Sequence, residues 1–168
     1  MSFQVTITAE TGRAYVPFLR KHLRAAHQLL EERRRRRRLP LREMSLALVG
    51  DARMGDLHHQ FMDIREPTDV LTFPIDEDDD GAVTSGEVVV CVPEARRQAK
   101  LRTIPVRLEL LLYSIHGMLH LLGYDDRIAR DFHTMHRTED DIMTKLGFEP
   151  VFAAAEAGNA APSTGRRR

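Results

Sequence analysis

The segment PVRLELLLYSIHGMLHLLGYDD, residues 105–126, constrains the fold of this chain more than any other part of the sequence. It is apolar almost throughout, yet it carries two histidines, and soluble proteins do not bury imidazoles without polar partners. Pro105 suits the first turn of a helix, and Gly123 suits the left-handed position that commonly ends one. We therefore expect a single buried helix that carries both histidines.

The two histidines have the spacing of a metal site. His116 and His120 are four residues apart, so on a helix both rings leave one face about 5–6 Å apart, where two nitrogens can bind one ion. Asp126 follows the Gly123 turn and completes a His-x3-His-x5-Asp pattern. Zinc hydrolases use three protein ligands and keep a fourth position open, so the pattern predicts a zincin-like zinc site.

Other interpretations of these residues stay open. Most histidine pairs at this spacing make ordinary hydrogen bonds in a core or on a surface. The apolar surroundings and the third donor favour the metal site here. As third ligand, Asp125 is the nearest rival of Asp126, whereas His133 and His136 lie farther along the next helix, where we expect them to face outward.

Glu139 interrupts the apolar series of that next helix, residues 128–146, at a place where another apolar residue is expected. A carboxylate on a buried face needs a hydrogen-bond donor, and metal-bound histidines usually donate to such a partner. We expect Glu139 to accept a hydrogen bond from a ligand imidazole or to pair with an arginine. The alternative is a rim position with the carboxylate in water.

Hydrophobic periodicity along the chain predicts an α/β (α+β) domain. Alternating or continuous apolar segments predict four strands, and apolar residues at helical spacing predict about five helices. The strands are expected at residues 1–8, 44–49, 68–75 and 86–92, and the helices at 13–32, 51–61, 93–100, 105–123 and 128–146. Pro74 marks a strand end or an exposed edge, and residues 76–81 read as a solvated acidic loop. The apolar strand at 86–92 is typical of one buried on both faces.

The composition fits one soluble domain. The chain has 168 residues, 42% hydrophobic and 30% charged, and its Lys+Arg and Asp+Glu counts are both 25. Net charge therefore gives no indication of a nucleic-acid partner. Cys91 is the only cysteine, so we expect a small buried thiol in a reducing compartment. The start lacks signal-peptide features, and the longest apolar stretch falls short of the ~20 residues that span a bilayer, so a cytoplasmic protein without a membrane segment is predicted.

The charges are unevenly placed along the chain. Arg33–Arg38 is a run of six arginines, which either meets phosphate groups or forms a solvated helix end before Pro40. Residues 151–168 are small and polar and end in arginines, which predicts a disordered basic tail. Residues 1–150 are then expected to form a single metal-dependent hydrolase domain.

Three motifs carry a resemblance to a known family. HGMLHLLGYDD at residues 116–126, EPTDVLTFP at 66–74 and SGEVVVC at 85–91 resemble the YbeY family of bacterial metal-dependent endoribonucleases. The resemblance implies a compact α/β fold with a small mixed sheet, one zinc ion per chain and single-strand-specific cleavage of RNA. It also implies a role in rRNA maturation, including processing of the 16S rRNA 3′ end, and in ribosome quality control. The implied partners are the ribosomal small subunit and ribosome-associated proteins, and the oligomeric state stays open.

The resemblance implies that His116, His120 and the residue at position 126 are zinc ligands, with the two histidines as catalytic residues. A three-ligand zinc acidifies the water in its open position, which makes a nucleophile available. Zinc peptidases with this spacing have a glutamate general base directly after the first histidine, and this chain has Gly117 there. A zinc metallopeptidase is therefore the weaker alternative. A further alternative is a non-catalytic, ribosome-associated RNA-binding factor that uses the arginine run and a structural metal.

Three positions depart from the pattern of the family. Asp126 stands where the family usually has a histidine, and a carboxylate also binds zinc. Met62 stands where the family has an arginine; if that arginine engages phosphate, another cation must replace it, and Arg65 is a candidate. Glu87 replaces the usual aspartate at the start of the buried strand, which keeps the charge and lengthens the side chain.

Overall fold

The computed structural model describes residues 2–34, 38–63 and 68–154. Along the chain these form β1 (Gln4–Ala9), the 3-10 turn η1 (Arg13–Tyr15), α1 (Val16–Arg33), β2 (Glu43–Val49), α2 (Asp51–Met62), β3 (Val70–Glu77), β4 (Val83–Cys91), α3 (Val92–Arg102), α4 (Val106–Leu121) and α5 (Ala129–Lys145). Each predicted strand and helix has a counterpart among these elements. The predicted α/β class is therefore confirmed.

The four strands form one mixed sheet in the order β1-β2-β4-β3. β1, β2 and β4 run parallel, and β3 pairs antiparallel with β4 at the edge. This edge position explains Pro74, because a proline nitrogen has no hydrogen to donate to a second neighbouring strand. Pairing continues past Pro74 to Glu77 across an irregular register, so β3 begins and ends two residues later than predicted. The loop between β3 and β4 is shortened to residues 78–82.

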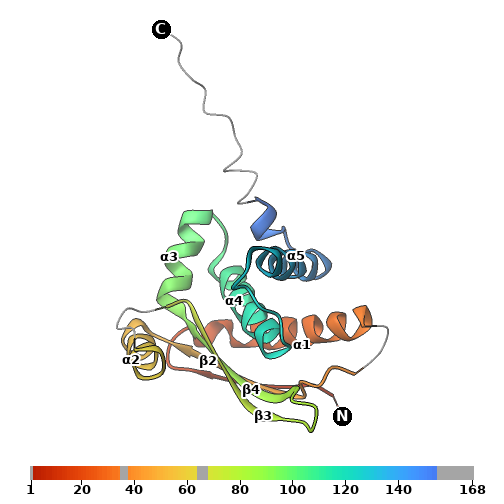
Figure 1. The fold of residues 1–168 in the computed structure, drawn as a ribbon. Helices are drawn as coiled ribbons and strands as arrows, with labels where there is room; N and C mark the ends of the chain where they lie inside the picture. Colours follow the sequence, from red (N-terminus) through yellow and green to blue (C-terminus); the bar gives the residue numbers. More distant parts are fainter. Residues whose placement is uncertain (1, 35–37, 64–67, 155–168) are drawn as a thin grey trace.

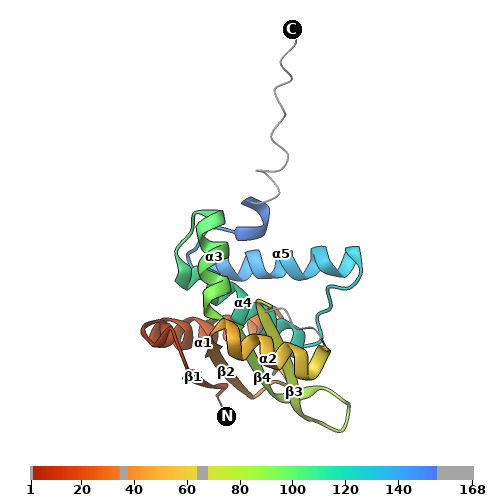
Figure 2. The same cartoon turned by 90° about the vertical axis from the view of Figure 1, so that its left-hand side faces the viewer.

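The sheet separates two layers of helices. α1 and α4 cover one face and α2 covers the other, while α5 lies on the outer side of α4 (Figure 1, Figure 2). The alternation of side chains along β4 follows these layers. Val88 and Val90 join the main core with α4, whereas Val89 and Cys91 pack with α2. Burial on both faces confirms the predicted central strand, and it raises the pKa of the Cys91 thiol to about 11, so this cysteine is a neutral part of the core.

α4 is the central helix, and its expected span is confirmed to within two residues at each end. Pro105 directly precedes the first helical residue, and Gly123, with a φ of 91°, follows the C-cap residue. Eleven of the 16 residues of α4 are buried. This burial explains why the helix is apolar almost all round instead of along one stripe.

Two glycines bring α4 close to β4. A Cβ atom at Gly117 would lie 2.5 Å from Cγ1 of Val88, and one at Gly86 would lie 2.5 Å from Cδ2 of Leu121. A close-packed interior has no space for an atom at such a distance, so a larger residue at either position would force the facing side chain to move. Gly117 thus faces the sheet. This contact sets the rotation of α4 and with it the direction in which the two histidines project.

The domain continues past residue 150. Residues 151–154 form a helical turn, and Val151 is buried in the main core. The Asp140 carboxylate accepts hydrogen bonds from the backbone N–H groups of Phe152 (2.9 Å) and Ala153 (2.8 Å). At least four residues of the predicted tail therefore belong to the domain. The remaining tail, 155–168, lies outside the described residues, as do residues 35–37 of the arginine run and Arg65.

Within the described ranges, each helix is too short or too polar to cross a lipid bilayer.

Candidate metal centre

Three side chains converge beside the C-terminal half of α4. Nε2 of His116 lies 3.0 Å from Nε2 of His120, and Oδ2 of Asp126 lies 3.5 Å from the first nitrogen and 3.6 Å from the second. Among the residues that the structure describes, no other group of three His, Cys, Asp or Glu side chains converges in this way. The three predicted ligands are thus brought together at one point.

Hydrogen bonds of the two imidazoles turn both Nε2 atoms toward that point. Nδ1–H of His120 donates to the backbone carbonyl of Tyr124 at 3.0 Å, and Nδ1–H of His116 donates to Oε1 of Glu139 at 2.5 Å. With the hydrogen on Nδ1, each neutral ring presents the lone pair of Nε2. Two lone pairs that face each other at 3.0 Å require a proton or a cation between them.

The spacing of the three atoms suits zinc. Zinc binds imidazole nitrogen at about 2.0–2.1 Å in tetrahedral geometry, which places neighbouring ligand atoms about 3.3 Å apart. The observed separations of 3.0, 3.5 and 3.6 Å bracket this value. Two imidazoles and one carboxylate are also a ligand set that zinc enzymes use. The residues present therefore fit a divalent transition-metal ion.

The turn after α4 carries Asp126 to the centre. The N–H groups of Gly123 and Tyr124 donate to carbonyls of the last helical turn, so the chain reverses past the helix end. The rival ligand, Asp125, has other partners: its carboxylate accepts the backbone N–H of Asp126 (2.7 Å) and an N–H of the Arg127 guanidinium (2.6 Å). Hydrogen bonding from Arg127 lowers the pKa of Asp125 to about 2. Asp125 thus shapes the loop, and Asp126 reaches the centre.

Glu139 is buried and binds two histidines at once. Its side chain is 2% exposed, Oε1 accepts from His116, and Oε2 accepts from Nδ1 of His136 at 2.7 Å. Burial would raise the pKa of Glu139, but the two imidazole donors outweigh burial and lower that pKa below its ordinary value. The prediction that Glu139 accepts a hydrogen bond from a ligand-candidate imidazole is confirmed, and the alternative of a rim position is wrong.

The two histidines of α5, His133 and His136, do not reach the centre. His133 is exposed and faces outward, as predicted. His136 does not face outward: its side chain is 19% exposed, and its ring stacks on Phe152 with centroids 4.5 Å apart. The prediction that His136 faces outward is therefore wrong, and the sequence did not reveal its hydrogen bond to Glu139. The spacing of His136 and Glu139, which places both on one helix face, is a signal that could have found it.

An open groove of about 410 Å³ adjoins the centre. The three ligand candidates line one part of it, and Thr72 and Pro74 of β3 and Met62 of α2 line another. Met62 is 58% exposed and brings no charge to the groove. Glu87 alternates along β4 with Val88, which packs on α4, so Glu87 belongs to the opposite face of the sheet from the centre.

A further buried carboxylate lies in the first turn of α4. Glu109 of α4 is 0% exposed, and within the described part of the chain neither of its oxygens has a hydrogen-bond partner. Nη1 of Arg102 lies 3.5 Å from Oε1. Burial raises the pKa of Glu109, the charge of Arg102 and the nearby Tyr113 hydroxyl oppose this rise, and the charges of Asp69 and Glu94 add to it.

The raised pKa of Glu109 predicts how stability depends on pH. The pKa of Glu109 is higher in the folded chain than in the unfolded chain, where it is about 4.3. The wild type therefore loses stability as the pH rises from the unfolded-state pKa to the folded-state pKa. Glu109→Gln should remove that loss and increase the free energy of unfolding at pH 8 by on the order of 1–3 kcal/mol, with a smaller gain at pH 5. Urea unfolding at both pH values measures this. The exposed Glu10→Gln is the control, and a Glu109→Gln protein less stable than wild type at pH 8 would contradict the prediction.

Comparison with known proteins agrees with this architecture. A profile of the family described as Endoribonuclease YbeY matches residues 7–147. The chain is 42% identical to Endoribonuclease YbeY of Rhodococcus opacus over 113 residues, which cover 62% of this chain and 63% of that protein. It is 36% identical to Endoribonuclease YbeY of Mycobacterium ulcerans over 123 residues, or 68% of this chain and 69% of that protein.

A solved structure shares the fold. The solution structure of TM1509 from Thermotoga maritima aligns with a TM-score of 0.56 and 23% identity, covering 98% of this chain and 99% of that one. This likeness supports the order of strands and helices described above. With the profile match over most of the chain, it leads to one assignment: the chain belongs to the YbeY endoribonuclease family.

Proposed function

We propose that this protein is a zinc-dependent, single-strand-specific endoribonuclease that acts in rRNA maturation. The observation that carries the proposal is the convergence of His116, His120 and Asp126, with both Nε2 lone pairs directed at one point by hydrogen bonds from Nδ1. The names of the relatives support an RNA substrate. Processing of the 16S rRNA 3′ end, ribosome quality control, association with the small subunit and a cytoplasmic location belong to the same proposal.

In this proposal each residue of the centre has a defined task. His116, His120 and Asp126 hold the zinc ion, which when bound supplies a Lewis acid that stabilises negative charge and acidifies water. Glu139 keeps the hydrogen of His116 on Nδ1, and the Tyr124 carbonyl does the same for His120. The groove beside the centre leaves space for a nucleic-acid strand to approach from the side of β3.

Packing at Gly117 favours phosphodiester cleavage over peptide hydrolysis. A peptidase of this spacing needs a glutamate directly after the first histidine. Here that position lies against Val88 of β4, where even a Cβ atom would be 2.5 Å from a side-chain carbon. A glutamate at this position would meet the sheet, so the helix packing is incompatible with that general base. The other alternative is a non-catalytic RNA-binding factor. A cleavage assay distinguishes it from the nuclease.

Incubation of the purified protein with single-stranded RNA, double-stranded RNA and casein tests the proposed function. We expect cleavage of single-stranded RNA, little cleavage of the duplex, no cleavage of casein, and loss of activity in a strong chelator. A chelator-sensitive cleavage of casein would favour the peptidase. RNA binding without any cleavage, at one zinc per chain, would favour the non-catalytic factor.

A further inference from the structure

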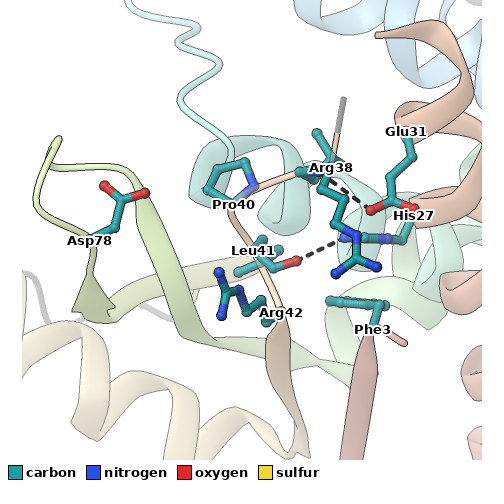
Figure 3. Close-up of a pocket in the computed structure, with 9 residues that line it drawn as sticks. Phe3, His27, Glu31, Arg38, Pro40, Leu41, Arg42 and Asp78 are labelled. Atoms are coloured by element: carbon teal, nitrogen blue, oxygen red, sulfur yellow. Dashed lines mark hydrogen bonds between the residues drawn. The ribbon is translucent and has the colours of Figure 1, made fainter. Parts of the chain in front are cut away.

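A polar hollow lies where the end of α1 meets the start of β2. It has a volume of about 480 Å³, and Figure 3 shows the side chains that line it. Phe3 precedes β1, His27 and Glu31 come from α1, residues 38–42 form the segment that enters β2, and Asp78 comes from the loop after β3. The hollow therefore joins segments that are far apart in the sequence.

Its floor is a fixed pair of rings. His27 is 4% exposed, and its Nε2–H donates to the backbone carbonyl of Leu41 at 2.9 Å. The imidazole stacks on Phe3 with ring centroids 3.9 Å apart and an angle of 4° between the planes. Burial lowers the pKa of His27, so the ring is neutral. The floor is held by α1 and by the segments that directly precede β1 and β2, and it does not depend on a ligand.

Three arginines surround this floor. Arg38 and Arg42 line the hollow, and Arg24 lines an adjoining one that shares Phe3 and His27. In Figure 3 the Arg38 side chain extends toward the two rings, and Arg42 lies on the other side of Leu41. All three arginines are exposed. Within the described residues none of the three guanidinium groups has an ion pair or a hydrogen bond, in contrast to Arg97 and Arg127, which are bound to carboxylates.

The two carboxylates of the hollow already have backbone partners. Oδ1 of Asp78 accepts the N–H groups of Asp80 (3.0 Å) and Ala82 (2.9 Å). Oε1 of Glu31 accepts the N–H of Leu39 at 3.4 Å. Across this hollow and the adjoining one, three guanidinium groups against two carboxylates leave a positive excess, and the unused N–H donors of arginine match the oxygens of a phosphate. The chemistry of the hollow is therefore that of a phosphate site.

Arg34, another residue of the arginine run, lies close to the loop that carries Asp126. Arg34, at the C-cap of α1, lines a third hollow together with Gly123, Tyr124 and Asp125, and the next residue in that loop is Asp126. Arg34 thus lies beside the loop of the metal centre, and Arg38 of the same arginine run lines the first hollow. A single nucleic-acid strand is a ligand that can occupy both places, because it carries a phosphate at every nucleotide.

We propose that Arg24, Arg38 and Arg42, with the floor formed by Phe3 and His27, make an RNA-backbone site that holds the substrate strand away from the bond that is cut. We name it the arginine pocket. The identity of the ligand as RNA rests on the proposed function, but binding at the arginine pocket needs no metal ion. The arginine pocket also supplies positive charge, which Met62 does not bring to the groove of the metal centre.

Binding of a labelled single-stranded RNA, followed by fluorescence anisotropy in chelator at several salt concentrations, tests the arginine pocket. The variant is Arg24→Ser/Arg38→Ser/Arg42→Ser, and the matched control is Arg13→Ser/Arg53→Ser/Arg96→Ser, which removes three exposed arginines outside both hollows. We expect the variant to lose about tenfold or more in affinity and its salt slope to fall by about 2, since each lost phosphate contact removes about 0.7. The control should change much less.

Further arms separate the possible outcomes. The triple replacement of the same arginines by lysine should restore most of the salt slope, and urea unfolding checks that the serine variant is folded. Equal loss of affinity in variant and control, or unchanged affinity in the variant, would refute the arginine pocket. Loss confined to the variant, in a protein that never cleaves RNA, would support the arginine pocket and refute the proposed nuclease activity.

Discussion

Asp126→Ala should reduce the zinc bound per chain steeply, while His133→Ala and His136→Ala leave it near one. The reason is geometric: Oδ2 of Asp126 lies 3.5 and 3.6 Å from the two Nε2 atoms, whereas His133 is exposed and His136 donates to Glu139. Removing one of three protein ligands leaves a site that holds zinc weakly. Elemental analysis of gel-filtered protein, loaded with one equivalent of zinc, measures the stoichiometry.

Two further variants sharpen this prediction. Asp125→Ala is the matched control for Asp126→Ala, because Asp125 contacts Arg127 and its own loop and should change zinc stoichiometry little. His116→Ala should abolish RNA cleavage, a loss of about 10³-fold or more, while RNA binding is largely kept. Equal zinc occupancy in Asp126→Ala and wild type would show that another group completes the centre.

Glu139→Gln should lower zinc affinity by about 10–100-fold, the usual effect of removing the hydrogen-bond partner of a metal-binding histidine. Glu139 accepts from His116 and His136 through its two oxygens. A glutamine can accept through one oxygen only, and its NH₂ group would face the N–H of the other imidazole. Competition with a chromophoric chelator measures the affinity.

The same variant should lower the melting temperature, because a buried imidazole loses its acceptor. Glu149→Gln, on an exposed residue after α5, is a suitable control, since none of the described hydrogen bonds or ion pairs involves its side chain. If Glu139→Gln left both the melting temperature and the zinc affinity unchanged, Glu139 would have no supporting role at the centre.

Much of the centre could be predicted from the sequence because its signals are local. The spacing of His116 and His120 on one helix, and the glycine that ends that helix, are set by helical geometry and not by distant contacts. The apolar run of β4 indicated a strand buried on both faces for a similar reason. Asp126 could be ranked above Asp125 only by position, and the structure gives the physical cause, which is the hydrogen bonding of Asp125 to Arg127.

The features that sequence reasoning missed depend on contacts between distant segments. The helical turn at residues 151–154 is held by Asp140, and no local pattern in a small, polar segment indicates such a partner. Pairing of β3 beyond Pro74 depends on β4 as neighbour. The arginine pocket unites Phe3 with the end of α1 and the start of β2. Residue propensities and hydrophobic periodicity carry no information about contacts between segments that are distant in the sequence.

The most direct test of metal-dependent RNA cleavage is a zinc titration of chelator-treated protein, with the initial rate of single-stranded RNA cleavage as readout. We expect no activity in the metal-free protein, a linear rise with added zinc, and a plateau at one zinc per chain that His116→Ala never reaches. Full cleavage activity in exhaustively chelated protein, or in His116→Ala, would contradict metal-dependent cleavage at this centre.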